Sequence, residues 1–179
     1  ASYAPGETTN GSQNDQYGAA LGYVRGPFRG KIAYANAKDA NGPGKDAKET
    51  FLGIRYDFGP VIGYLNYVIN RGAIVPGTPN YKSQDLLVGA VVPIGQGRLI
   101  LSYINKNDRS ADNFDAQQYA IGYVYSLSKR TSLYTSYAYI DNKASNTSPT
   151  GFYRVWNAND IGNMTAGNRA FSVGINHQF

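Results

Sequence analysis

Hydrophobic and polar positions alternate with a period of two along most of this chain, and the 3.6-residue period of an amphipathic helix is not found. Nine segments show the alternation, and one parity of each contains no Asp, Glu, Lys or Arg. They are residues 17–23, 28–34, 52–58, 61–69, 86–94, 99–103, 119–127, 133–139 and 171–179. Successive side chains of a strand point to opposite faces, so the pattern predicts β-strands with one apolar face and one small, polar and partly charged face.

The connections between these segments are alternately short and long. The short connections are residues 25–27, 59–60, 95–97 and 128–131, and the long ones are 36–49, 70–84, 106–117 and 142–167. Gly, Pro, Asn and Asp are frequent in them, as turns require. This alternation predicts an antiparallel up-and-down sheet with all its tight turns at one end.

Aromatic residues of the apolar parity lie at the segment ends, with aliphatic residues between them. Tyrosine can place its ring at the acyl boundary and its hydroxyl in water, and two such rows are typical of the aromatic girdles of a transmembrane β-barrel. The predicted row at the tight-turn end contains Tyr23, Phe28, Tyr56, Phe58, Tyr125 and Phe179, and the row at the long-loop end contains Tyr17, Tyr34, Tyr67, Tyr103, Tyr119, Tyr139 and Phe171. The alternative is a soluble β-sandwich or small barrel with the apolar face inside.

The composition excludes several classes of enzyme active site. The chain has no cysteine and one histidine, His177, so an iron–sulfur centre, a cysteine nucleophile and a multi-histidine metal site are excluded. His177 lies on the apolar parity, which argues against the histidine–serine pair of an outer-membrane lipase. Asp108, Asp112 and Asp115 lack the spacing of an EF-hand. We therefore predict no enzyme activity, no metal and no cofactor.

Four basic residues lie on the polar parity, Arg29, Lys31, Arg55 and Arg98, in a chain of net charge +5. If the polar face lines an aqueous lumen, these side chains lower the barrier for anions. The alternative is ordinary lumen polarity, with Arg55 paired to Asp57 and Glu49. Because the basic and the aromatic residues lie on opposite faces, nucleic-acid binding is not predicted.

Two segments resemble a known family. Residues 168–179 resemble the C-terminal strand of Gram-negative outer-membrane porins, which ends on phenylalanine after alternating apolar residues, and residues 123–134 resemble the last periplasmic turn of general porins. The resemblance implies a β-barrel of the Gram-negative outer membrane, in contact with its lipid, that lets small hydrophilic solutes or ions diffuse passively. It also implies a homotrimer and recognition by the barrel-assembly machinery, through Phe171, Val173, Ile175 and Phe179.

The length departs from this family. Bacterial single-chain barrels have even strand numbers, and at about 20 residues per strand a barrel of sixteen strands needs roughly 320 residues. We therefore expect residues 1–179 to form a single domain that is the C-terminal portion of a porin barrel, strands eight to sixteen, with the upstream strands and constriction loop absent from this chain and residues 1–14 in a loop. A closed barrel that serves as an adhesin, receptor or structural anchor is the alternative function.

Overall fold

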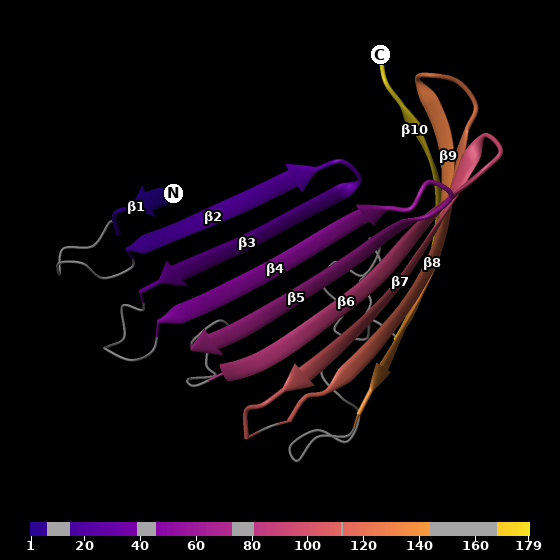
Figure 1. The fold of residues 1–179 in the computed structure, drawn as a ribbon. Coiled ribbons are helices and arrows are strands. Elements are labelled where there is room, and N and C mark those ends of the chain that lie inside the picture. Colours follow the sequence, from indigo (N-terminus) through magenta and orange to yellow (C-terminus); the bar gives the residue numbers. More distant parts are fainter. Residues whose placement is uncertain (7–14, 39–45, 73–80, 112, 144–167) are drawn as a thin grey trace.

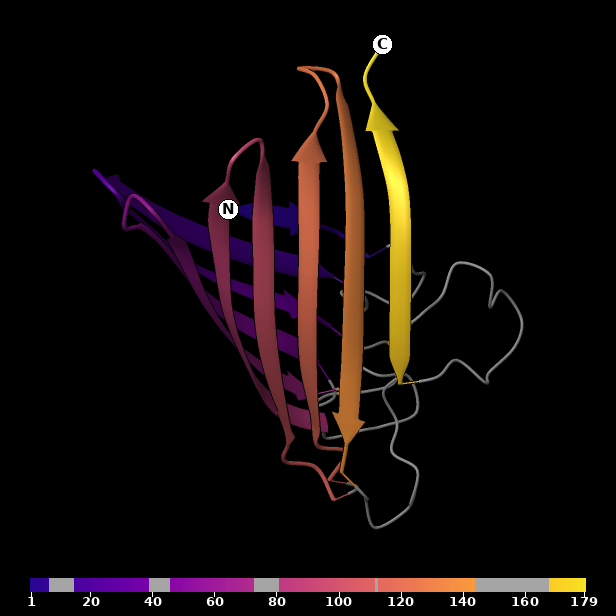
Figure 2. The same ribbon diagram turned by 90° about the vertical axis from the view of Figure 1, so that its right-hand side faces the viewer.

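The computed structural model describes residues 1–6, 15–38, 46–72, 81–111, 113–143 and 168–179. These residues form one antiparallel sheet of ten strands in which each strand pairs with its neighbours in the sequence. The sheet is twisted and curved, with β1 and β10 at opposite edges (Figures 1 and 2). The strands are β1 (Ser2–Ala4), β2 (Gln16–Arg25), β3 (Phe28–Ala37), β4 (Ala47–Asp57), β5 (Ile62–Gly72), β6 (Tyr81–Ile94), β7 (Gly97–Asp108), β8 (Ala116–Ser126), β9 (Thr131–Asn142) and β10 (Arg169–His177).

The antiparallel up-and-down fold is confirmed, but the number of strands was predicted wrongly. The tenth strand is β1, which pairs with the start of β2 through Ser2–Gly18 and Ala4–Gln16, in a region expected to be a loop. Its three residues are too few to show an alternation of polar and apolar positions. With β1 included, the described sheet has ten strands, which is an even number.

Most strands also extend further into the long connections than predicted. Strand β6 begins at Tyr81, not at residue 86, and β7 ends at Asp108, not at residue 103. The added residues are largely polar on both parities, so they carry no two-residue pattern. Backbone hydrogen bonds between strands do not require apolar side chains, and the ladder therefore continues beyond the apolar band.

The register keeps the apolar parity on one face across the whole sheet. Leu65 stands opposite Val88, and Ala90 stands opposite Leu101. The apolar side chains remain exposed, for example Leu21 at 73% and Val173 at 72%. Within the described ranges no second layer covers this face, and only three hydrophobic residues are buried, Tyr81, Ala116 and Ile140. A soluble sandwich would bury this face, whereas membrane lipid provides an apolar environment for it.

The tight turns join the strands at one end of the sheet. Gly26 and Gly95 have φ angles of 54° and 57°, a conformation that favours glycine. In the turn between β8 and β9, the Ser128 hydroxyl accepts the backbone N–H groups of Arg130 at 3.2 Å and Thr131 at 3.0 Å. No helix that could span a membrane is found in the part of the chain that the structure describes.

Both edges of the sheet are open. Strand β1 covers only the first residues of β2, so residues 19–25 have no partner on that side among the described strands. Strand β10 pairs with β9 alone, and β1 and β10 do not pair with each other. The ten described strands therefore do not close into a barrel by themselves.

Candidate pore-lining surface

The face opposite the apolar one carries the basic residues singled out from the sequence. Arg29 on β3 stands opposite Arg55 on β4, and Lys31 stands opposite Gly53. Adjacent strands are about 4.8 Å apart, so these three cations form one group. Arg98 on β7 stands opposite Pro93 and Val124, three strands away from β4, and is not part of the group.

The three grouped cations differ in their partners. The Arg55 guanidinium forms a salt bridge with the Asp57 carboxylate at 3.2 Å, and Tyr64 stands opposite Arg55 on β5. Glu49 forms no salt bridge with Arg55. Arg29 and Lys31 are exposed and take no part in the salt bridges of the described residues. Their positive charges are therefore available to ions near this face.

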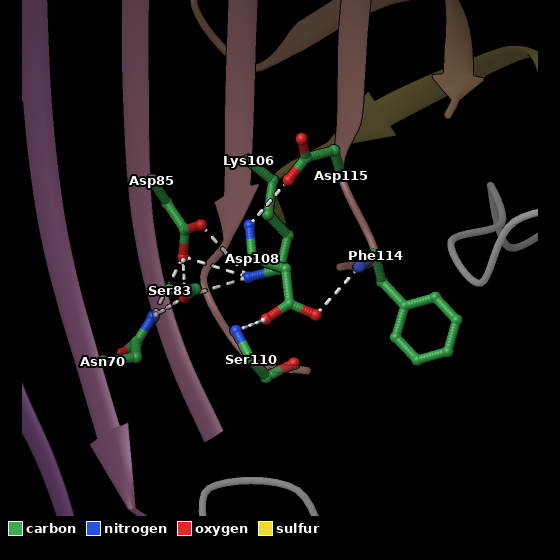
Figure 3. A network of polar contacts seen from close by, with 8 residues as sticks. All are labelled: Asn70, Ser83, Asp85, Lys106, Asp108, Ser110, Phe114 and Asp115. Atoms are coloured by element: carbon green, nitrogen blue, oxygen red, sulfur yellow. Dashed lines mark hydrogen bonds and ion pairs between the residues drawn. The ribbon is translucent and has the colours of Figure 1, made fainter. Parts of the chain in front are cut away.

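A second polar group on the same face joins β5, β6 and β7 near the long connections (Figure 3). The Lys106 ammonium lies 3.1 Å from an oxygen of the Asp85 carboxylate. The Asn70 amide donates to the Ser83 hydroxyl at 3.0 Å and to Asp85 at 2.9 Å. Lys106 also lies over the ring of Tyr81, 5.3 Å from its centre. This network cancels the charge of Lys106 and ties three strands together.

The carboxylates considered for cation binding instead hold a short loop. Asp108, only 1% exposed, accepts the backbone N–H groups of Ser110 at 2.8 Å and Phe114 at 2.9 Å (Figure 3). Asp115 accepts the backbone N–H of Asp108 at 2.9 Å, and Asp112 lies outside the described residues. The connection predicted at 106–117 is thus shortened to 109–115. No cluster of three or more potential metal ligands occurs within the described ranges.

Sequence reasoning missed the Asp85–Lys106 network because both residues fell outside the predicted strands. A signal was nevertheless present in the parity of the flanking residues. Extended backwards from Leu87, the polar-face positions are Asp85 and Ser83, and extended forwards from Ile104 the next is Lys106. The register places Asp85 directly opposite Lys106.

Both predicted rows of aromatic residues belong to the opposite, apolar parity. The tight-turn row lies at the strand ends, whereas Tyr67, Tyr103 and Tyr119 of the long-loop row lie several residues inside the ends of β5, β7 and β8. Ring centres at the tight-turn end are 6.2 Å apart for Tyr23–Phe28 and 4.6 Å apart for Tyr56–Phe58. At the long-loop end they are 6.5 Å apart for Tyr17–Tyr34 and 5.1 Å apart for Tyr103–Tyr119. The remaining members of the rows stand opposite residues of the same face: Tyr67 opposite Leu52 and Leu86, Tyr125 opposite Gly97 and Leu133, Tyr139 opposite Tyr119 and Arg169, and Phe171 opposite Tyr137.

The residues predicted as an assembly signal lie on or just after β10. Phe171, Val173 and Ile175 point to the apolar face and are exposed. Phe179 lies beyond the end of β10, with its ring edge-on to His177 at 4.9 Å between centres. The His177 Nδ1 atom is 2.9 Å from the Thr131 hydroxyl.

A single open sheet with an apolar outer face and a polar inner face defines the wall of a transmembrane β-barrel. The sequence profile of the Gram-negative porin family matches residues 1–145 of this chain. The chain therefore belongs to the Gram-negative porin family, as the resemblance predicted, and it is a protein of the outer membrane.

Known relatives agree with this assignment. The chain is 30% identical over 169 residues to outer membrane porin protein 32 of Delftia acidovorans, an alignment that covers 90% of this chain and 46% of that protein. The structure of an anion-selective porin from Comamonas acidovorans matches with a TM-score of 0.71 and 26% identity, over 99% of this chain and 54% of the other.

Two more distant structures share the fold. A porin refined at 1.8 Å matches with a TM-score of 0.69 and 14% identity, over 97% of this chain and 54% of the other. OmpT of Vibrio cholerae, in its trimer form, matches with a TM-score of 0.62 and 13% identity, over 92% of this chain and 57% of the other. The chain spans about half the length of these relatives.

Proposed function

We propose that this chain forms part of the wall of a water-filled channel, through which small hydrophilic solutes diffuse passively with a weak preference for anions. The observation that carries the proposal is the pair Arg29 and Lys31, exposed on the polar face without an acidic partner among the described residues. Such charges lower the barrier for anions in a pore. The relative of known structure described as an anion-selective porin supports the same preference.

We further propose that the ten strands are the C-terminal portion of a larger barrel. The open edges of β2 and β10 support this view, because unpaired strand edges cannot face lipid. Strands outside residues 1–179 would pair with both edges. A complete barrel of sixteen strands leaves an aqueous interior, whereas a barrel of eight to ten strands is filled by side chains.

Partners follow from the same proposal. The two aromatic rows contact outer-membrane lipid, and Phe171, Val173, Ile175 and Phe179 are read by the barrel-assembly machinery. The complete protein forms a homotrimer, and the structure of OmpT of Vibrio cholerae, which shares the fold, is described as a trimer form. It acts as a channel and not as an enzyme, and it uses no cofactor.

Reversal potentials under a salt gradient test the channel and its preference. The complete porin is reconstituted in planar bilayers, and the variant Arg29→Gln/Lys31→Gln is compared with the wild type. We expect the reversal potential to move towards the cation side. The matched control is Arg25→Gln/Arg169→Gln, which removes two positive charges on the parity of the apolar face and should leave the potential unchanged.

Two results would contradict the proposal. An unchanged reversal potential in the Arg29→Gln/Lys31→Gln variant would mean that these residues are ordinary polar residues of the lumen and do not affect selectivity. The absence of any conductance in the correctly folded complete protein would favour a closed barrel acting as an adhesin, receptor or anchor.

A further inference from the structure

An aromatic side chain without a hydroxyl group lies on the polar face beside the unpaired cations. Phe51 on β4 has the parity of Gly53 and Arg55, and it stands opposite Ala33 on β3 and Val68 on β5. The other aromatic residues of this face in the described strands are all tyrosines, Tyr64, Tyr81 and Tyr134. A phenyl ring on the wall of an aqueous pore exposes apolar surface to water, which is unfavourable unless another apolar group covers it.

The ring of Phe51 lies against the backbone at Gly53. A Cβ atom added at Gly53 would lie 2.7 Å from Cε1 and 2.8 Å from Cζ of Phe51, so the ring occupies the space that a side chain would need. Gly53 is consequently buried although it lies on the polar face. The ring therefore extends along β4 towards Arg55 and away from Glu49, the nearest acidic residue on the other side of Phe51 along the strand.

The position of the ring brings it next to the two unpaired cations. Lys31 stands directly opposite Gly53, one strand spacing of about 4.8 Å away, and Arg29 stands opposite Arg55. Both cations are exposed and take no part in the salt bridges of the described residues. An aromatic surface and positive charge thus occur side by side on one face. A solute that matches both has a ring and an anionic group.

We propose that Phe51, Lys31 and Arg29 bind aromatic carboxylates as these pass through the channel. The ring of the solute stacks on Phe51 in the offset arrangement that aromatic pairs prefer. Its carboxylate accepts hydrogen bonds from the Arg29 guanidinium, which can hold both oxygens, or from the Lys31 ammonium. The inference rests on the proposed channel function and names the class of anion for which this wall has a binding site.

Two acids of nearly the same size distinguish ring stacking from simple apolar contact. Benzoate has a flat aromatic ring, whereas cyclohexanecarboxylate is saturated and more apolar. A patch that only buries apolar surface binds the saturated acid at least as tightly, because the free energy gained is proportional to the apolar area removed from water. A stacking site prefers benzoate, because aromatic pairs contribute beyond their buried area.

Block of the chloride current through the complete porin in planar bilayers tests the site. Each acid is added as its potassium salt at neutral pH, and the concentration that halves the chloride current is measured. We expect benzoate to block the wild type at a roughly two- to tenfold lower concentration than cyclohexanecarboxylate.

Variants separate the ring from the charge. Phe51→Leu keeps an apolar side chain and should remove the preference for benzoate, whereas Phe51→Tyr keeps a ring and should retain the preference. Lys31→Gln should weaken the block by both acids. The matched control, Phe28→Leu, removes a ring on the apolar parity of the neighbouring strand β3 and should leave the preference for benzoate unchanged.

Two outcomes would overturn the inference. The wild type could respond equally to the two acids or prefer the saturated one, a comparison that needs no variant to fold. Phe51→Leu could keep the preference for benzoate, which would place the aromatic contact elsewhere in the pore. A wild type that conducts chloride but treats the two acids alike refutes this inference alone, whereas the absence of chloride conductance refutes the proposed channel as well.

Discussion

Two regions of the polar face hold their cations in opposite ways. Near the long connections, the side chains of Lys106 and Asp85 are only 19% and 20% exposed and form an ion pair. Nearer the tight turns, Arg29 and Lys31 are exposed and have no acidic partner among the described residues. A charge cancelled at close range has little effect on distant ions, whereas an unpaired charge acts over a Debye length. Pairing, and not position on the polar face alone, therefore decides which cations can contribute to the proposed selectivity.

Removing the partner of Lys106 should have the largest effect. Asp85→Ala leaves a mostly buried ammonium without its carboxylate, which should lower the free energy of unfolding by about 2–3 kcal/mol. Urea unfolding of the complete porin in lipid vesicles measures this loss. The double variant Asp85→Ala/Lys106→Met removes both charges and should recover part of the stability. If the double variant is no more stable than Asp85→Ala, the ion pair is not the cause.

Selectivity should respond to the unpaired cation and not to the ion pair. Arg29→Gln alone should lower the anion-to-cation permeability ratio by about a factor of two. Asp85→Asn/Lys106→Gln removes a pair of opposite charges and should leave the ratio unchanged. Reversal potentials under a gradient of about 0.1 M against about 0.5 M KCl, which brackets the physiological ionic strength of about 0.15 M, measure both variants. Equal shifts in both variants would contradict the proposed difference between the unpaired cation and the ion pair.

Salt should weaken selectivity but not the ion pair. The Debye length falls from about 10 Å at 0.1 M to about 3 Å at 1 M, so the field of Arg29 and Lys31 is screened. We expect the proposed anion preference of the wild type to decline over this range. The destabilisation caused by Asp85→Ala should change little, because the pair is mostly shielded from solvent. A preference that persists at 1 M would point to binding at short range.

The smallest effect is expected for Arg55, which lies between the two cases. Its partner Asp57 has a side chain that is 38% exposed, so solvent screens the pair and Asp57→Asn should change the free energy of unfolding little. The freed guanidinium should raise the anion preference slightly. The control Asp141→Asn removes the same charge on the parity of the apolar face and should leave the preference unchanged.

The sequence predicted most of the fold because the alternation of polar and apolar positions repeats from strand to strand. Alternation from residue 17 to residue 179 identified nine of the ten strands, their faces and the end that carries the tight turns. Strand β1 was missed because Ser2–Ala4 is too short to show an alternation of polar and apolar positions. The same limit applies to the strand ends near the long connections, where polar residues occupy both parities.

For the candidate site, the sequence predicted on which face of the sheet each residue lies but not which residues are neighbours. Parity placed Arg29, Lys31, Arg55 and Arg98 together on the polar face, yet only the register shows that Arg98 lies apart. The pairing of Asp85 with Lys106 joins residues 21 positions apart. No short-range pattern specifies such a contact, because it depends on the lengths of two strands and of their turn.

The strictly sequential pairing of the strands has a consequence for how the protein folds. Each strand pairs only with its neighbours in the chain, so the sheet from β2 to β9 can grow one hairpin at a time with little loop-closure entropy. In the larger barrel proposed above, the edges of β2 and β10 pair outside this order and therefore last. We therefore expect amide protons of β5 and β6 to be protected early in refolding and those of β10 late, an order that pulse-labelled hydrogen exchange measures.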